Sequence, residues 1–122
     1  MSESVLIVGA GIGLSAAIAR RCYKAGMNVT LAARNLNKIQ GVAEETNAEL
    51  IMCDSCEESQ VINLFEKQDS LNRSLDLVVY NPSARVPGSI TEVNIEKAKR
   101  ALDITCYGAF LVAQQASRRM IK

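Results

Sequence analysis

Hydrophobic positions along the chain form short continuous runs that alternate with stretches of helical periodicity. Four runs have the length of a strand, and strands are predicted over Ser4–Gly9, Met27–Ala33, Glu49–Cys53 and Leu75–Tyr80. Continuous apolar runs of this length are typical of parallel strands that are buried on both faces of a sheet.

Between these runs, apolar residues recur at intervals of three and four, as on an amphipathic helix. A first helix is predicted over Ile12–Ala25, with Gly26 as its stop, and its buried stripe is expected to be Leu14, Ala17, Ile18, Cys22 and Ala25. A second is predicted over Leu36–Thr46, with Asn35 as its N-cap.

A third helix is predicted after an S-x-x-E capping box formed by Ser55 and Glu58, and it should bury Val61, Leu64 and Phe65. The stretch 83–90 contains Pro87-Gly88 and indicates a loop. The remainder predicts a long helix that allows a break near Gly108. Its apolar positions are Ile95, Ala98, Leu102, Cys106, Ala109, Ala113, Ala116 and Met120.

The predicted order is therefore βαβαβαβ followed by a long helix, within one domain over 1–122. Strands separated by helices imply right-handed crossovers and a parallel sheet. The fold class expected is α/β, a Rossmann-like doubly wound sheet of about four strands in the order 3-2-1-4. Its ligand crevice should lie between the first and fourth strands.

Composition narrows the function classes. The chain is 48% hydrophobic with a formal net charge of +1 and shows no run of Lys or Arg. We therefore expect no nucleic-acid partner and no membrane-surface partner. The start lacks a basic region, and its apolar segment Val5–Ala10 is too short for a signal peptide or a membrane span, which favours the cytoplasm.

The four cysteines are interpreted as structural thiols. Cys53 and Cys56 form a CxxC, but the chain has no histidine and no second CxxC, so a zinc or redox site is disfavoured. Cys22 and Cys106 fall on the apolar faces of predicted helices, where a free cysteine behaves as a small hydrophobe.

The segment Val8–Ser15 joins the first strand to the first helix and holds Gly9, Gly11 and Gly13 within five residues. Glycines at such a junction let backbone amides approach a pyrophosphate at the helix N-terminus. A turn that merely needs a positive φ is the plainer alternative. The strand before and the helix after favour nucleotide binding.

The end of the second strand should decide the choice of cofactor. NAD-binding sites place an acid there, whereas this chain has Ala33-Arg34-Asn35. Arg34 suits the 2′-phosphate of NADP, because a guanidinium binds phosphate through two parallel hydrogen bonds. A solvated surface charge is the alternative for Arg34. NADP is therefore predicted over NAD.

Together these residues resemble the short-chain dehydrogenase/reductase family over the whole chain. The family's TGxxxGxG motif lies on Val8–Ser15, where Gly9 and Gly13 match and Val8 and Ser15 depart from it. The family's aspartate after the third strand, which contacts the adenine, resembles Asp54. Its NNAG motif falls on 80–83, where only Asn81 is kept.

The resemblance implies an oxidoreductase that acts on an alcohol or carbonyl with a nicotinamide dinucleotide. The residues expected to bind the cofactor are Gly9, Gly11, Ile12, Gly13, Arg34, Asn35, Asp54, Ser55, Asn81 and Pro82. Thr105 stands where the family carries a catalytic Asn.

No catalytic residue is assigned. The family's chemistry uses a Tyr acid with a Lys four residues later and a Ser, and none of the tyrosines at 23, 80 and 107 is followed by that Lys. We therefore expect a truncated dehydrogenase. A domain boundary or a genuine small binding protein would also fit a chain of this length.

A non-catalytic nucleotide-binding module and a methyltransferase remain alternative functions. The latter is disfavoured by Arg34, because such enzymes have an acid at that position. The fourth strand would carry Leu77, Val78 and Val79 on an open edge, and the last helix would expose Phe110 and Leu111. Homo-oligomerisation through that edge or that helix is therefore predicted.

Overall fold

The protein is built around a four-stranded sheet in which every neighbouring pair of strands is parallel. The computed structural model describes residues 2–121. The strands are β1 (Ser4–Val8), β2 (Asn28–Ala33), β3 (Glu49–Met52) and β4 (Leu77–Tyr80). Their order is β3-β2-β1-β4, which confirms the predicted topology. Val8 at the end of β1 pairs with Ala32 and Tyr80, so the strands end together at one edge.

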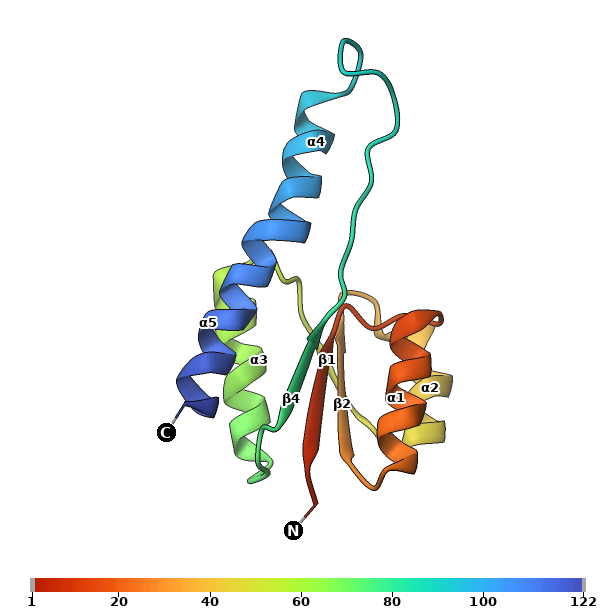
Figure 1. Cartoon of the computed structure of the whole chain (residues 1–122), viewed down its shortest axis with the longest axis vertical. Helices are drawn as coiled ribbons and strands as arrows, with labels where there is room; N and C mark the ends of the chain where they lie inside the picture. The colour runs from red at the N-terminus through yellow and green to blue at the C-terminus, as the bar shows by residue number, and fades with distance from the viewer. Residues whose placement is uncertain (1, 122) are drawn as a thin grey trace.

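Helices cover both faces of the sheet (Figure 1). Helices α1 (Leu14–Lys24) and α2 (Gln40–Thr46) cover one face, and α3 (Glu58–Ser70) and α5 (Gly108–Met120) cover the other. Helix α4 (Ile95–Leu102) continues into α5 through a π-turn at Asp103–Tyr107. Together with the connection 81–94, α4 forms an arm that projects beyond the carboxyl ends of the strands (Figure 1).

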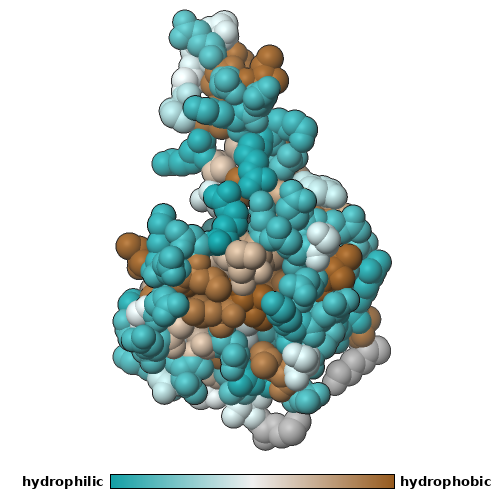
Figure 2. Space-filling model, turned by 180° about the vertical axis from the view of Figure 1, so that it is seen from behind, coloured by the Kyte–Doolittle hydropathy of each residue, from teal (hydrophilic) through white to brown (hydrophobic). Residues whose placement is uncertain are grey.

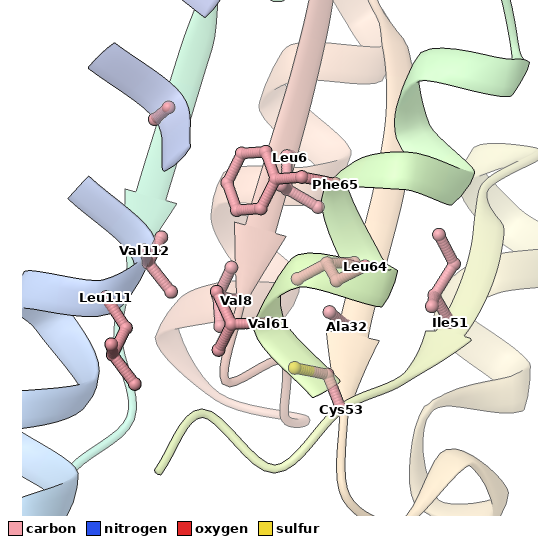
Figure 3. Packing of buried hydrophobic residues seen from close by; sticks show 11 residues of the cluster. Leu6, Val8, Ala32, Ile51, Cys53, Val61, Leu64, Phe65, Leu111 and Val112 are labelled. Atoms are coloured by element: carbon pink, nitrogen blue, oxygen red, sulfur yellow. The ribbon is translucent and has the colours of Figure 1, made fainter. Parts of the chain in front are cut away.

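The core consists of two layers that share β1. Leu6 and Val8 face α3 and α5, where Phe65 is completely buried (Figure 3). Val5 and Ile7 point to the opposite layer, under α1 and α2. Because side chains alternate along a strand, a strand of five buried residues requires cover on both faces.

The predicted buried stripe of the first helix was confirmed at Cys22 and, in part, at Ile18, which is partly buried against the core; it was wrong at Leu14, Ala17 and Ala25. Helix α1 instead buries Ser15, Ala16, Ala19 and Cys22, while Leu14 is 64% exposed. The residues of α1 that pack on the sheet are therefore mostly small, whereas the larger Leu14 stays exposed to solvent. The periodicity of apolar residues indicated the helix, but it did not indicate which face of the helix packs against the sheet.

The predicted stripe of the last helix was wrong in its first half and was confirmed at Ala116. Helix α4 stands on the arm and buries no residue, so Ile95 is 83% and Leu102 65% exposed. The π-turn then adds a residue to the helical repeat before α5, where Ala116 is buried. Leu111 is buried rather than exposed, and Cys106 is exposed rather than on an apolar face; both predictions were wrong. Phe110 is 58% exposed, as expected.

The local capping predictions had opposite outcomes. Asn35 accepts a hydrogen bond from the Asn37 N–H at 3.0 Å, which confirms it as a cap, although the first turn, Leu36–Ile39, is a 3-10 helix. The capping box was wrong: α3 begins after Glu57 without a side-chain cap. Ser55 is directed to Tyr80 instead, with 3.1 Å between their hydroxyl oxygens.

Candidate cofactor site

A cleft of about 780 Å³ opens where the four strands end. It lies at the base of the arm, and segments that follow all four strands line it. Nine of the ten residues predicted to bind the cofactor line this cleft. They are Gly9, Gly11, Ile12, Arg34, Asn35, Asp54, Ser55, Asn81 and Pro82. The tenth, Gly13, lies beside it as the residue before α1.

In the glycine turn, Gly9 is closely packed, whereas Gly11 and Gly13 have open space beside them. Gly9 has φ +81°, and a Cβ at this position would lie 2.5 Å from the Pro82 nitrogen. Gly11 and Gly13 have no heavy atom within 4 Å of the place where a Cβ would be. Helix α1 begins there without a side-chain cap or an acid in its first turn. Its free N–H groups and positive dipole end therefore suit an anion.

A short hydrogen-bond chain holds the floor of the cleft. The Asn81 amide donates to Ser15 Oγ at 2.9 Å, and Ser15 Oγ donates to the Gly9 carbonyl at 3.2 Å. The Asn81 N–H also donates to the Val8 carbonyl at 2.9 Å. Ser15, which replaces the last glycine of the family's motif, is buried. Through these two hydrogen bonds it links Gly9 after β1 to Asn81 after β4.

Three cations line the cleft. Arg34 and Lys38 come from the segment after β2, whereas Arg100 comes from α4. Sequence reasoning found Arg34 but missed Lys38 and Arg100. Lys38 could have been found from its place four residues after Arg34. Arg100 had no such signal, because the contact that places it joins residues 46 positions apart.

Asp54 is the acid among these cations. Its Oδ1 accepts the Cys56 N–H at 3.0 Å, and its Oδ2 accepts from Arg100 Nη2 at 3.1 Å. Burial raises the pKa of Asp54, but these two hydrogen bonds and the nearby charge of Arg34 outweigh it. The pKa of Asp54 therefore lies below its ordinary value, and the carboxylate is ionised at neutral pH.

Tyr80 joins three segments at the inner wall. Its hydroxyl donates to the Ile104 carbonyl in the π-turn and shares a hydrogen bond with Ser55. Burial raises the pKa of Tyr80. Thr105, at the position of the family's catalytic Asn, donates to the Ala101 carbonyl at 2.8 Å. Both hydroxyl protons therefore serve internal hydrogen bonds.

A glycine turn before a helix, a cation after β2 and an acid after β3 are a dinucleotide-binding arrangement. The family model described as short chain dehydrogenase matches residues 3–122. The chain belongs to this family. A relative from Escherichia coli (strain K12), a cyclic-di-GMP-binding biofilm dispersal mediator protein, is 30% identical; the match covers 97% of this chain and 48% of that protein.

A second relative and a solved structure are similar in sequence and in fold. An uncharacterized oxidoreductase of Staphylococcus aureus (strain N315) is 26% identical over 96% of this chain and 52% of its own length. The structure of a family member from Mycobacterium marinum superposes with a TM-score of 0.92 at 29% identity, covering 97% of this chain and 48% of that one. The chain thus spans about half the length of the curated relatives it matches.

Proposed function

We propose that this chain is the NADP(H)-binding part of a short-chain dehydrogenase that acts on an alcohol or carbonyl. The observation that carries the proposal is the pair Arg34 and Lys38 in the segment after β2; Arg34 stands where NAD-binding sites have an acid. No ion pair joins either cation to a carboxylate among residues 2–121. Both charges can therefore serve a phosphate monoester.

The cleft fits the remaining parts of such a cofactor. The open turn at Gly11 and Gly13 and the uncapped start of α1 would hold the pyrophosphate. Asp54 and Ser55 would face the adenine end, and Asn81 and Pro82 would form the wall opposite. When bound, the cofactor would supply a hydride to a carbonyl or accept one from an alcohol. The role of this chain in that chemistry is to bind the cofactor and to orient it.

The acid–base part of the reaction is not assigned to any residue of this chain. The hydroxyls of Tyr80 and Thr105 are both engaged with backbone carbonyls. Neither has a lysine four residues later. The oxidoreductase activity of the whole protein is therefore proposed from family membership, while cofactor binding is proposed from the cleft itself.

The decisive experiment exchanges the charge at Arg34. Binding is followed by the change in cofactor fluorescence on titration. The wild-type protein should bind NADPH with a lower dissociation constant than NADH. Arg34→Asp should remove that preference, because a carboxylate repels the 2′-phosphate and accepts ribose hydroxyls. Arg21→Asp makes the same charge change on α1 outside the cleft and should leave the preference intact. An unchanged NADPH preference in Arg34→Asp contradicts the proposal.

We further propose that the chain self-associates through the edge of β4 or the outer face of α5. Within residues 2–121, β4 pairs with β1 alone, which leaves one edge open. Leu77 on this edge is 40% exposed, and Phe110 on α5 is 58% exposed. Hydrophobic side chains are also exposed elsewhere, over the body and at the tip of the arm (Figure 2).

Sedimentation velocity separates the two surfaces. Leu77→Lys should dissociate the assembly if the strand edge forms the contact, and Phe110→Lys should do so if the helix does. A wild-type monomer at high concentration contradicts both forms of the proposal.

We also propose a reducing, cytoplasmic location. All four cysteines are free, and Cys22 and Cys53 are buried in the core. No helix within residues 2–121 has the length and apolar character needed to cross a membrane.

A further inference from the structure

Arg100 reaches the cleft from an element that otherwise stands away from the sheet. Helix α4 belongs to the projecting arm (Figure 1), yet the guanidinium of Arg100 binds the carboxylate of Asp54 after β3. Both residues line the cleft. The Arg100 side chain is 39% exposed and that of Asp54 is 22% exposed, so the pair is accessible from the cleft and not sealed in the core.

The pair presents a hydrogen-bond acceptor directly beside a donor. A carboxylate has about four lone-pair positions, of which the Cys56 N–H and Arg100 occupy two. A guanidinium has about five N–H bonds, and Asp54 is its one hydrogen-bond partner within residues 2–121. Both groups therefore keep free capacity for a ligand while each holds the other in place.

Arg100 differs from Arg34 and Lys38 in whether its positive charge is balanced by a carboxylate. Those two cations form no ion pair with a carboxylate within residues 2–121 and suit a phosphate, as argued above. The charge of Arg100 is offset by Asp54 at 3.1 Å. A neutral ligand group with a donor beside an acceptor is the better match for such a pair, since it satisfies both groups without adding charge.

We propose that Arg100 contacts the base of the bound nucleotide, beside the adenine contact that the family resemblance implies for Asp54. This inference rests on the proposed NADP(H) binding. One edge of adenine offers the N6 amino donor next to the N7 acceptor. The amino group would donate to the Asp54 carboxylate, and N7 would accept from the Arg100 guanidinium. Guanine offers two acceptors on the corresponding edge, so Asp54 would repel it.

Arg100→Met tests this contact, with Lys99→Met as the matched control. Lys99 is the neighbouring cation on α4, pairs with Asp103 at 2.8 Å and does not line the cleft. Dissociation constants for NADPH and NADH are measured by fluorescence titration. Arg100→Met should weaken both about tenfold or more and by the same factor, because a hydrogen bond from a charged group is lost. Lys99→Met should change neither more than about twofold.

The outcomes distinguish this inference from the proposed function. If wild-type protein binds neither NADPH nor NADH, the proposed function fails. If it binds NADPH but Arg100→Met has no effect, only the inference fails. A loss confined to NADPH would make Arg100 a 2′-phosphate ligand and overturn the base contact. GDP that competes as well as ADP would also overturn it. Arg100→Lys keeps the charge and should restore part of the affinity; thermal melting confirms that each variant is folded.

Discussion

Replacing Gly9 by alanine tests the central packing contact of the cleft. Two costs combine at this position. Gly9 has φ +81°, and a left-handed conformation costs a residue with a Cβ about 1–2 kcal/mol. The new Cβ would also lie 2.5 Å from the Pro82 nitrogen and 2.6 Å from its Cδ and Cγ. Overpacking of this kind costs about 1–3 kcal/mol.

Pro82 cannot easily retreat from the added methyl group. The preceding residue, Asn81, is bonded through its N–H to Val8 and through its amide to Ser15. The two costs should therefore add, and Gly9→Ala should lower the free energy of unfolding by roughly 2–5 kcal/mol. Because small domains are stable by about 5–15 kcal/mol, this loss is readily measured by urea denaturation.

Gly26→Ala is the matched control. Gly26 has φ +86°, but nothing lies within 4 Å of its missing Cβ, so only the conformational cost of about 1–2 kcal/mol applies. The double variant Gly9→Ala/Pro82→Ala should recover part of the loss, since it removes the two ring carbons but not the nitrogen. Equal destabilisation by Gly9→Ala and Gly26→Ala would refute the role assigned to Pro82.

Three further predictions concern the inner wall of the cleft. Gly108→Ala should destabilise the protein by about 1–3 kcal/mol, because its Cβ would collide with the Tyr80 hydroxyl. Gly41→Ala is the control and should not destabilise it, because Gly41 lies in α2 with open space around it. Equal unfolding free energies of the two variants would contradict this prediction. Burial, with the nearby charge of Asp54, raises the pKa of Cys53 to about 11 from about 9. Iodoacetamide at pH 8 should therefore modify the exposed Cys106 before Cys53, as mass spectrometry can show. Between pH 9 and 11 the unfolded chain releases this proton before the folded one, so stability should fall with rising pH, and less steeply in Cys53→Ala.

The order of the elements was predictable because the signal that encodes it is local. A buried parallel strand must be apolar along its whole length, so β1 is visible in five consecutive residues. Glycine and proline then mark where each element stops. From this alternation, the parallel sheet and its order follow from general rules of connection.

The buried faces of the helices were less predictable, because they depend on contacts that no local pattern records. The stripe of α1 was misplaced since packing favours Ala16 and Ala19 over the larger Leu14. The stripe of the last helix was misplaced because α4 stands on the arm and buries no residue, and because a π-turn interrupts the helical repeat before α5. The Ile104 carbonyl in that turn accepts a hydrogen bond from Tyr80, 24 residues away in the chain.

The same distinction applies to the cleft. Residues that follow a strand directly could be assigned from sequence, since parallel strands bring their carboxyl ends to one edge. Arg100 could not, because α4 meets the cleft only through its ion pair with Asp54. Ser55 was assigned to a local cap, whereas its hydroxyl is used in a bond to Tyr80. Polar residues with both a local and a distant partner are where sequence patterns fail.

The hydrogen bonds at the cleft also bear on how it would bind a nucleotide. Asn81 and Ser15 join the ends of β1 and β4, Pro82 packs on Gly9, and Cys56 and Arg100 orient Asp54. These contacts join residues of the protein to one another, so a bound nucleotide does not have to form them. Within residues 2–121, the side chains of Arg34 and Lys38 lack such partners. Ordering of these two cations should therefore be the main conformational cost of binding a 2′-phosphate, and NADH would not require it.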